Sequence, residues 1–538
     1  MNEDDVVLAY HERTKHHPYR FAAALPYLDW ATQPDPFRRY AGAPLVKLEL
    51  PGTGRALPYF RLFEPDAVPA APLSMESLSL FFRYSLSLTA WKKIETSTWS
   101  LRANPSSGNL HPTEGYAILP AVDGVALAPG VFHYAPREHA LELRATLKEA
   151  PVPDGAFLAG LTSIHWREAW KYGERAFRYC QHDLGHALAA MRVAAAALGW
   201  RLLLLEGLRD SVIPDLLGIG RDEDFGDAER EEPEILAIVS PGPAPGATLR
   251  ALPAADWRGR ANVLSAEHSA DWPVIEEAAR ATRRAARAPL AEGLHGFPTA
   301  EALFGAPVRA SRLTAERAIL ERRSAVAMDR ETSIPRETFF RMLARLVPTR
   351  DGRAMPWDAI PWRPRVHLAL FVHRVDGLAP GLYALPRDPE KLEPMRRATR
   401  RKEFAWRGVP SSPPGLPLRL LEERDCRSLA AAVSCGQDIA GDGAFSLGMI
   451  AELGESLAAF GPAFYRNLHW EAGVVGQVLY LEAVEAGIGS TGIGCFFDDS
   501  VHAVFGIDST GWQSLYHFTV GGPVEDTRLT TLPGYGPR

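Results

Sequence analysis

Two stretches of the chain repeat apolar residues every three or four positions, which is the spacing of a helix with one buried face. The first begins near Gly173 and is predicted to end at Gly199, because a glycine commonly closes a helix. Its buried face comprises Phe177, Gln181, Leu184, Leu188, Met191, Ala195 and Leu198. The second has a face made by Leu468, Ala472, Val475, Leu479, Ala483 and Ala486. A shorter helix is predicted from a cap at Ser74 through Phe82.

Shorter apolar runs between turn residues indicate strands around these helices. Strands are predicted at residues 116–119, 130–134 and 235–239. Residues 202–205 are four consecutive leucines, and they predict a strand that is buried on both faces. An amphipathic helix is expected over residues 272–287. Residues 1–70 are rich in proline, aspartate and aromatic side chains, and are expected to form an extended arm.

A glycine-rich stretch lies between the second long helix and another helix expected to start at Asp498. Residues 487–497 read Gly-Ile-Gly-Ser-Thr-Gly-Ile-Gly-Cys-Phe-Phe. Four glycines in eight residues disfavour a stable helix or strand. We therefore predict a bend that lies flat against a ligand and offers backbone N–H groups to a flat cofactor or an anion. A tight interior turn is the simpler alternative.

Several short motifs recur in the same order in the two halves of the chain. Val-Asp-Gly occurs at 122–124 and 375–377, and Asp-Ser-Val occurs at 210–212 and 499–501. Gly199 and Gly487 are 288 residues apart, as are Gly218 and Gly506 (487 − 199 and 506 − 218). This common register predicts an internal duplication. The expected parts are an arm at 1–70, one copy at 71–245, a linker with a helix at 246–310 and a second copy at 311–538.

Composition agrees with two globular copies and narrows the function. The 538 residues are 46% hydrophobic and 23% charged, which is typical of a globular chain too long for one core. A net charge of −6 gives no reason to expect nucleic acid or an anionic membrane as a partner. The four cysteines form no CxxC motif, and the acidic start of the chain resembles no signal peptide. We expect a cytoplasmic location, because the apolar run at 201–206 is too short to span a bilayer.

A second motif changes the interpretation of the glycine-rich stretch. Residues 104–112 read Asn-Pro-Ser-Ser-Gly-Asn-Leu-His-Pro. Together the two motifs resemble the nitroreductase-like FMN flavoproteins, and among them the SagB/ThcOx-type dehydrogenases, which oxidise azoline rings in modified peptides. The resemblance extends over roughly residues 75–535. It implies an α+β fold of two tandem nitroreductase-like domains, each a mainly antiparallel sheet flanked by helices, forming an intramolecular pseudo-dimer.

Members of this family are usually symmetric homodimers with FMN at each of two subunit interfaces. One subunit supplies an Arg-Arg-Ser start and the glycine-rich stretch, and the other supplies the Pro-Ser-Ser-Gly-Asn loop. Here the Arg-Arg-Ser start and the glycine-rich stretch are in the second half, whereas the loop is in the first. In the opposite combination, residues 202–209 carry bulky side chains and residues 356–364 replace the loop. The resemblance therefore implies one complete FMN site per chain and one dead site.

The resemblance also implies which residues bind FMN. The phosphate would be held by Arg322, Arg323 and Ser324, with Arg528 as a C-terminal basic ligand. The alternative for the paired arginines is a solvated helix face. Small side chains must lie against the flat isoalloxazine ring, and the loop supplies Pro105, Ser106, Ser107 and Asn109. The alternative for the loop is an ordinary proline turn.

The glycine-rich stretch would face the reactive edge of the flavin. The residues expected to bind there are Gly489, Thr491, Gly492, Ile493 and Gly494. Backbone N–H groups around the middle of this set would approach the ring and stabilise reduced flavin.

The azoline dehydrogenases carry a Lys-Tyr pair before the long helix, and Lys171-Tyr172 matches that placement. FMN accepts the hydride, so the protein must supply a base. Lys171 would be that base if burial favours its neutral amine, with Tyr172 relaying or orienting the proton. An exposed lysine beside a core tyrosine is the alternative. The expected function is FMN-dependent oxidation of a heterocycle, in a small molecule or a modified peptide.

Other functions stay open on the sequence alone. His182 and His186 have the i, i+4 spacing of a zinc-hydrolase helix, but no third ligand is evident and no metal is expected. An NAD(P)H-dependent nitro- or quinone reductase would use the same FMN site. A non-catalytic flavin-binding protein would keep the motifs without turnover. The sequence identifies neither the substrate nor the electron acceptor.

Overall fold

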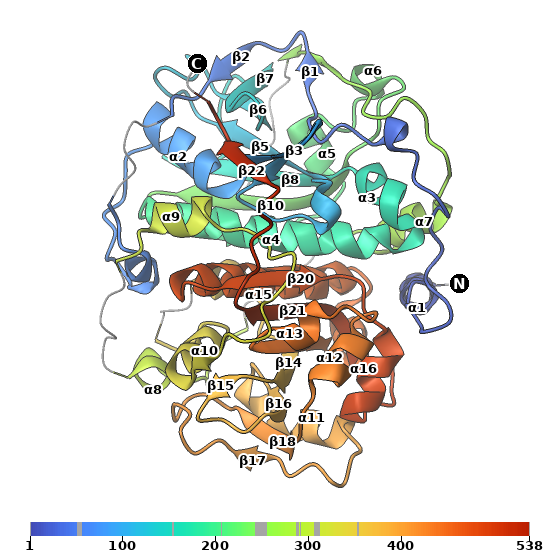
Figure 1. The fold of residues 1–538 in the computed structure, drawn as a ribbon. Coiled ribbons are helices and arrows are strands. Elements are labelled where there is room, and N and C mark those ends of the chain that lie inside the picture. Colours follow the sequence, from blue (N-terminus) through green and yellow to red (C-terminus); the bar gives the residue numbers. More distant parts are fainter. Residues whose placement is uncertain are drawn as a thin grey trace.

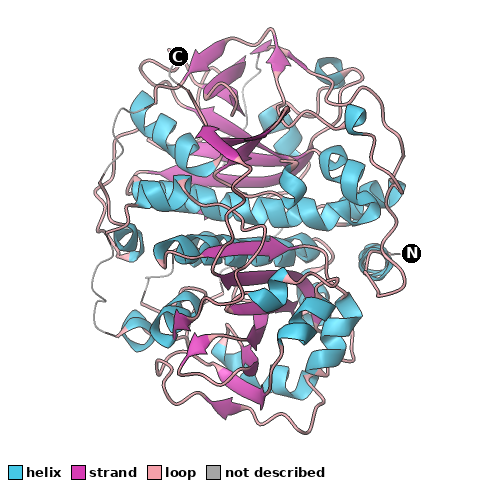
Figure 2. Ribbon diagram, in the orientation of Figure 1, coloured by secondary structure: helices cyan, strands magenta, loops and turns pink. Residues whose placement is uncertain are grey.

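The computed structural model places one large antiparallel sheet in each half of the chain, with two long helices between these sheets (Figure 1 and Figure 2). It describes residues 2–50, 56–152, 155–205, 207–242, 256–286, 290, 292–305, 312–351 and 355–536. Helices cover both sheets, so the fold is α+β, as the sequence predicts. Within the described residues, none of the helices combines the length and the apolar character that a membrane span requires.

The first sheet has the strand order β11-β7-β6-β5-β8-β10-β9, with β2 beside β7. Its strands are β2 (Leu45–Lys47), β5 (Thr113–Leu119), β6 (Gly130–Ala135), β7 (Ala140–Thr146), β8 (Phe157–Ser163), β9 (Arg201–Leu204), β10 (Glu232–Ser240) and β11 (Asp256–Trp257). The helices of this half are α2 (Met75–Ser85), α3 (His165–Tyr172), α4 (Ala176–Ala197), α5 (Val212–Leu217), α6 (Asp222–Phe225) and α7 (Pro273–Ala281). Ser74 caps α2 by accepting a hydrogen bond from the Ser77 amide, which confirms the predicted start.

The second sheet has the strand order β17-β18-β16-β14-β19-β21-β20. Its strands are β14 (Val366–Val372), β16 (Gly381–Leu385), β17 (Arg407–Gly408), β18 (Arg419–Glu423), β19 (Phe445–Ala451), β20 (Gly489–Ile493) and β21 (Gln513–Gly521), and β13 (Ile334–Pro335) pairs separately with β15 (Val375–Asp376). The helices are α8 (Ala300–Phe304), α9 (Ala315–Leu320), α10 (Arg336–Ala344), α11 (Leu392–Ala398), α12 (Arg427–Val433), α13 (Ile439–Asp442), α14 (Leu453–Phe460), α15 (Phe464–Glu485) and α16 (Asp498–Phe505). Strand β19 and helices α14 and α15 begin and end 288 residues after β8, α3 and α4.

The two long helices, α4 and α15, cross in direct contact where two glycines meet. A β-carbon on Gly185 would lie 2.1 Å from the Trp470 carbonyl oxygen, and one on Gly473 would lie 2.2 Å from the His182 carbonyl oxygen. Side chains at these two positions would force the helices apart, so glycine sets the close crossing. The predicted extents of both helices are confirmed, with Gly199 in the left-handed region (φ +68°) after α4.

Two buried ion pairs connect the halves on either side of this crossing. Arg178 on α4 donates to Asp498 at 2.8 Å, and Arg466 on α15 is paired with Asp210. Arg178 and Asp210 lie 288 residues before Arg466 and Asp498 respectively, so each half sends an arginine to the aspartate of the other. The four side chains are almost completely buried, and these contacts fix how the halves are placed.

The N-terminal segment differs from the predicted extended arm, because it begins with helix α1 (Glu3–Arg13). Asn2 and Asp5 form a capping box that was missed in the sequence. Farther along, β1 (Tyr40–Ala41) pairs with β12 (Arg260–Ala261). The C-terminal β22 (Thr530–Pro533) pairs with β3 (Leu88–Ile94), which pairs with β4 (Ser97–Arg102), so the end of the chain crosses back onto the first half (Figure 1).

Three predicted elements need correction. The glycine-rich stretch contains a strand, β20, which pairs along its length with β21 at the edge of the sheet. The leucine run in β9 is also an edge strand, and its residues alternate between buried and more exposed positions. Helix α7 stops at Ala281, short of the predicted residue 287, which lies outside the described residues. The proposed boundaries at 245/246 and 310/311 lie outside them as well.

Candidate functional site

Three predicted motifs meet where the two halves face each other. Ser324 forms a parallel bridge with Ser490 in β20, and the Ala325 amide donates to the Ser490 carbonyl at 3.0 Å. Arg322 donates from Nε to the Ala103 carbonyl at 3.2 Å and from Nη2 to the next carbonyl upstream at 3.1 Å. These carbonyls directly precede the Pro-Ser-Ser loop, so Arg322 joins the second half to the loop of the first.

Arg322 is a buried cation that has no carboxylate partner in the described part of the chain. Its residue is 3% exposed, and its Nη1 atom has no hydrogen-bond partner there. Burial lowers the pKa of Arg322 to about 10, although the Tyr480 ring, 4.9 Å from its Cζ atom, opposes the change. A buried charge without an opposite charge is costly, so an anion at Nη1 would stabilise this arrangement.

The other predicted phosphate ligands differ in how close they come. Arg323 is half-buried and donates from Nη1 to Thr89 Oγ1 at 3.3 Å and to the Leu320 carbonyl at 2.8 Å. The Ser324 hydroxyl lies 2.8 Å from the Tyr480 hydroxyl. Arg528 is exposed and forms a bidentate pair with Asp526, and no contact among the described residues connects it to the other three. The structure therefore gathers Arg322, Arg323 and Ser324 but leaves Arg528 outside.

The Pro-Ser-Ser loop is held in place by side chains around it. The backbone N–H and the hydroxyl of Ser107 both donate to Asp183 Oδ1 on α4, at 3.0 and 3.1 Å. The hydroxyl of Ser106 accepts from the His111 amide at 2.8 Å. Asn109 adopts a left-handed conformation and donates from Nδ2 to the Ser100 carbonyl at 2.8 Å. These contacts fix the loop against α4 and leave Pro105 and the short serine side chains beside the interface between the two halves.

Lys171 and Tyr172, at the end of α3, lie against this loop. A β-carbon on Gly108 would be 2.5 Å from the Tyr172 hydroxyl and 3.2 Å from Lys171 Nζ. Both side chains are half-buried, so the pair is not the exposed lysine beside a core tyrosine of the alternative interpretation. The centroids of the Tyr172 and Tyr179 rings are 4.6 Å apart. Burial raises the pKa of Tyr172 well above its usual value. Tyr172 is therefore protonated at neutral pH.

Two buried carboxyl groups beneath the loop were missed in the sequence. Asp183 is 2% exposed and Glu168, on α3, is fully buried. Burial raises the pKa of Asp183 to about 7, against the hydrogen bonds from Ser106 and Ser107. Burial also raises the pKa of Glu168 well above its ordinary value, and the charge of Asp183 adds to this. The only signal in the sequence was Asp183 between two histidines, which pointed to a metal helix instead.

The glycine-rich strand is closely packed against tyrosine side chains. A β-carbon on Gly492 would lie 1.8 Å from the Tyr516 hydroxyl, and one on Gly494 would lie 2.4 Å from the Tyr179 ring. The Gly492 N–H donates to the Tyr480 hydroxyl at 3.0 Å. Thus these glycines are needed for close contact with aromatic rings. Gly489, Thr491 and Ile493 pair with β21 in the same strand.

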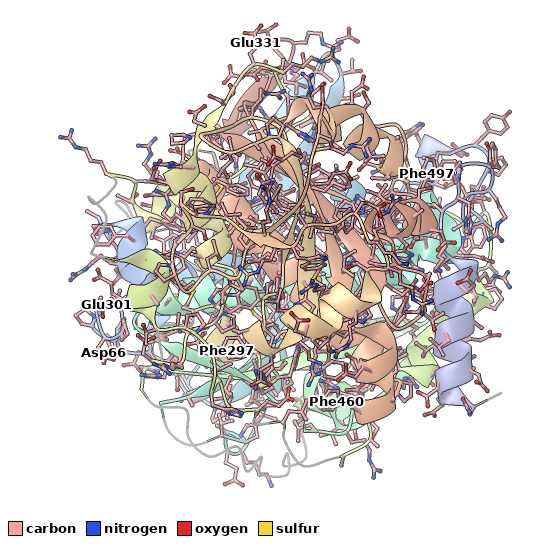
Figure 3. The ribbon with its side chains drawn as sticks, turned by 90° about the horizontal axis from the view of Figure 1, so that it is seen from below. Asp66, Phe297, Glu301, Glu331, Phe460 and Phe497 are labelled. Atoms are coloured by element: carbon pink, nitrogen blue, oxygen red, sulfur yellow. The ribbon has the colours of Figure 1, made fainter. Side chains whose placement is uncertain are left out.

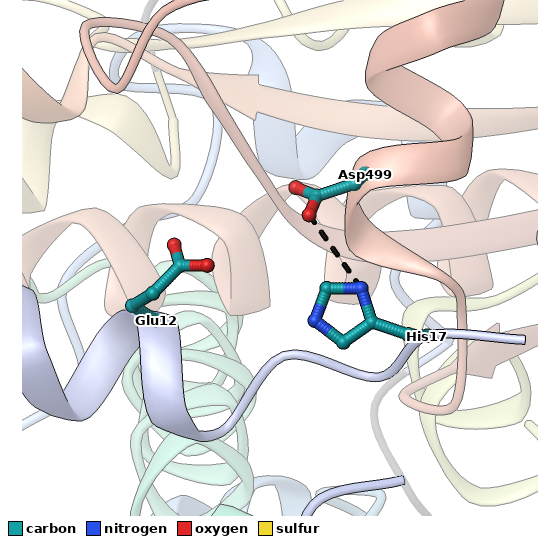
Figure 4. Close-up of side chains that lie close together, drawn as sticks. All are labelled: Glu12, His17 and Asp499. Carbon is teal, nitrogen blue, oxygen red and sulfur yellow. Dashed lines mark ion pairs between the residues drawn. The ribbon is translucent and has the colours of Figure 1, made fainter. Parts of the chain in front are cut away.

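The histidines of α4 do not converge as metal ligands. The His182 ring stacks on Tyr516 at 4.4 Å, while His186 faces Gln477 and the same tyrosine hydroxyl. Among the described residues, one group could hold a metal by distance alone: Glu12, His17 and Asp499 (Figure 4). Lys15 Nζ lies 2.8 Å from Glu12 and 3.0 Å from Asp499, so an internal cation already neutralises these carboxylates.

Comparisons with known proteins show which class of protein the chain is similar to. Residues 319–522 match the Nitroreductase family. A nitroreductase-like protein of Anabaena variabilis has a solved structure that aligns with a TM-score of 0.69 and 23% identity, covering 96% of this chain and 99% of that one. At this identity the likeness shows the fold alone. Residues 319–522 thus carry a nitroreductase-family match, and together with the relatives below this supports a flavin-type oxidoreductase at family level.

Two relatives are similar over shorter stretches. The trifolitoxin-processing protein TfxB of Rhizobium leguminosarum bv. trifolii is 30% identical over 162 residues, which cover 27% of this chain and 43% of TfxB. The nitroreductase-like protein MJ1384 of Methanocaldococcus jannaschii is 26% identical over 163 residues, covering 28% of this chain and 77% of that protein. The chain thus spans less than half the length of TfxB.

Proposed function

We propose that this chain is an FMN-dependent oxidoreductase of the SagB dehydrogenase type, with one flavin site between its halves. The observation that carries the proposal is Arg322, a buried guanidinium with one free donor and no carboxylate among the described residues. A phosphate group is the anion that matches an arginine fork beside a serine hydroxyl.

The residues around Arg322 fit a phosphorylated flavin. Arg322, Arg323 and Ser324 would hold the phosphate, and the Pro105–Ser107 side of the loop offers small groups to a flat ring. When bound, FMN supplies a two-electron hydride acceptor. Lys171 would then remove the substrate proton, because its Nζ lies against the loop at Gly108. Tyr172 keeps its proton and would orient the substrate through its O–H group.

The single site is best understood if the chain arose by tandem duplication. The 288-residue register extends to whole elements, since α3 and α4 have the same lengths as α14 and α15. The crossed pairs Arg178–Asp498 and Arg466–Asp210 are the contacts expected of a two-fold dimer fused into one chain. We infer an intramolecular pseudo-dimer in which one of two ancestral flavin sites survives.

The proposed substrate is a heterocycle in a modified peptide or a small molecule. This rests on the Lys171-Tyr172 placement and on likeness to TfxB, which is named for processing of a peptide toxin. Reduction of nitro compounds or quinones with NAD(P)H is the second candidate, and the name of MJ1384 favours it. Turnover with NADPH and a quinone, measured beside turnover of an azoline peptide with dioxygen, separates the two.

Flavin content tests the central proposal. The chain purified from riboflavin-replete cells should be yellow, and denaturation should release about one FMN per chain. Arg322→Ala should lower FMN occupancy by about tenfold or more, because it removes about 1.5–3 kcal/mol of charge-assisted hydrogen bonding. Arg528→Ala is the matched control and should retain flavin. A colourless wild-type chain, or full occupancy in Arg322→Ala, would refute the proposal.

A further inference from the structure

Two cysteines face each other beside the candidate site, and the proposed function does not use them. The Sγ atoms of Cys435 and Cys495 are 2.7 Å apart, and both residues are half-buried free thiols. This distance is longer than a covalent S–S bond of about 2.05 Å and shorter than ordinary contacts of about 3.5–4.0 Å between heavy atoms. The residues are 60 positions apart, which explains why no CxxC motif revealed them.

Hydrogen bonds hold the two cysteine segments together. Gln437 Nε2 donates to the Cys495 carbonyl and to the Ser434 carbonyl, both at 2.9 Å. On the other side, the Phe497 amide donates to the Val433 carbonyl at 2.8 Å. Because both backbones are already fixed around the thiols, a bond between the sulfur atoms requires little movement of the chain. Phe497 is labelled in Figure 3.

The surroundings favour attack by Cys495 rather than by the other thiols. Contact with the Cys435 thiol lowers the pKa of Cys495, whereas the same contact raises the pKa of Cys435; the Arg175 guanidinium acts to lower the pKa of both thiols. A lower pKa gives more thiolate, which is the nucleophile. Cys180 and Cys426 are buried, and burial raises the pKa of both thiols. The facing pair is therefore the reactive one of the four cysteines.

We propose that Cys435 and Cys495 are a redox-active dithiol, which a low-molecular-weight disulfide oxidises to an intramolecular disulfide. The Cys495 thiolate attacks one sulfur of the external disulfide, forms a mixed disulfide and releases one thiolate. Cys435 then attacks Cys495 Sγ, loses its proton to solvent, and expels the second thiolate. The protein loses two electrons, and the external disulfide gains them as two thiols. Excess external thiol reverses both steps.

The pair is placed to report its redox state to the candidate site. Cys495 directly follows Gly494, whose carbonyl accepts a hydrogen bond from the Tyr179 hydroxyl at 3.2 Å. Tyr179 in turn contacts the Tyr172 ring. Oxidation would attach this end of the glycine-rich strand to the end of α12. The dithiol chemistry itself needs no flavin, so it stands or falls independently of the proposed function.

Thiol counting on the full chain tests the proposal. The reduced protein is incubated with oxidised glutathione, alkylated, digested and analysed by mass spectrometry. We expect loss of two alkylatable thiols per chain, a linked pair of peptides containing Cys435 and Cys495, and full recovery with dithiothreitol. Cys180 and Cys426 are internal controls and should be alkylated after unfolding in every sample. Complete alkylation of Cys435 and Cys495 after the incubation would overturn the proposal.

Single variants test the order of attack. Cys435→Ser should retain one glutathione on Cys495, because no second thiol resolves the mixed disulfide. Cys495→Ser should react with glutathione about tenfold more slowly than Cys435→Ser. Cys435→Ala and Cys495→Ala repeat the measurement if a serine variant unfolds early in a thermal scan. Equal labelling of all variants and no linked peptide in the wild type would exclude a dithiol.

Discussion

Helices α4 and α15 carry matched residues 288 positions apart, and the two sets face different loops. On α15, the Tyr480 hydroxyl lies 2.8 Å from the Ser324 hydroxyl, and the Tyr480 ring forms a cation–π contact with Arg322. Arg322 has no carboxylate partner among the described residues. Its counterpart on α4, Arg192, forms a bidentate pair with Asp358 at 2.9 and 2.7 Å. Asp358 belongs to the segment that replaces the Pro-Ser-Ser loop. The same helix position thus carries a tyrosine beside an unpaired arginine on one side and an arginine in an ion pair on the other.

The matched carboxylates show the same contrast. Asp183 accepts hydrogen bonds from Ser106 and Ser107 of the loop, and no cation among the described residues pairs with it. Its counterpart Glu471 is paired with Arg387 and accepts from the Trp362 ring N–H at 3.1 Å and from the Arg365 amide. Unpaired buried charges are costly, so they persist mainly where function requires them.

The residues before the long helices differ as well. Lys171 and Tyr172 precede α4, and Ala459 and Phe460 are at the matching positions before α15. Cavity volume does not mark the candidate site. A cavity of about 550 Å³ lies on the opposite side, where Arg192 is paired with Asp358, and it is lined by Trp357 and Trp362. Charge left without a partner, rather than empty volume, marks the candidate site.

The largest expected effect comes from removing the proposed base, Lys171, which has an alanine at the matching position on the other side. Lys171→Ala should lower kcat for the oxidised substrate by about 10²–10⁴-fold, because a positioned base contributes that much. Flavin content, measured by absorbance, should be unchanged, since Lys171 is not placed at the phosphate. Ala459→Ser on the matched side is the control and should leave kcat as it is. Unchanged turnover in Lys171→Ala would remove lysine from the mechanism.

The next effect concerns pH. Asp183 has a folded pKa of about 7, above its unfolded value of about 3.9, so the folded chain binds the extra proton between these values. The free energy of unfolding should therefore fall as pH rises through this window, by at most about 4 kcal/mol. Asp183→Asn should abolish this loss and make the chain more stable than wild type at pH 8, as measured by urea unfolding.

Glu471→Gln is the matched control for the pH prediction. It removes the partner of Arg387, so it should destabilise the chain by about 3 kcal/mol at pH 5 and at pH 8 alike. If Asp183→Asn and the wild type lose stability equally between pH 5 and pH 8, the carboxyl of Asp183 is not the group that titrates.

The fold and part of the site could be predicted because they depend on local patterns. Helical periodicity defined α4 and α15, and the loop and Arg322 carried recognisable motifs. The glycine-rich strand could not be predicted, because pairing with β21 outweighs the low strand propensity of glycine at the sheet edge. Helix α1 depends on a capping box that was overlooked in a segment rich in proline.

Which charged residues at the interface between the two halves have partners could not be predicted, for a different reason. Whether Arg322 or Arg192 has a partner depends on residues more than one hundred positions away, which only the tertiary structure brings close. Asp183 and the loop residue Ser107 are likewise 76 positions apart, and Cys435 and Cys495 are 60 positions apart. Sequence patterns identify residue types that can bind an anion, whereas the tertiary structure decides which of them are left unpaired.

The smallest expected effect concerns Arg322 and Arg192 in the flavin-free chain. Replacing each of them with methionine should change the free energy of unfolding in opposite directions. Arg322→Met removes an unpaired buried charge and keeps the volume, so it should raise the free energy of unfolding by about 1–3 kcal/mol. Arg192→Met leaves Asp358 without its partner and should lower it by a similar amount. Added FMN should raise the melting temperature of the wild type and of Arg192→Met but not of Arg322→Met. Destabilisation of the flavin-free chain by both substitutions would mean that Arg322 is a structural residue, and the contrast between the two sides would be lost.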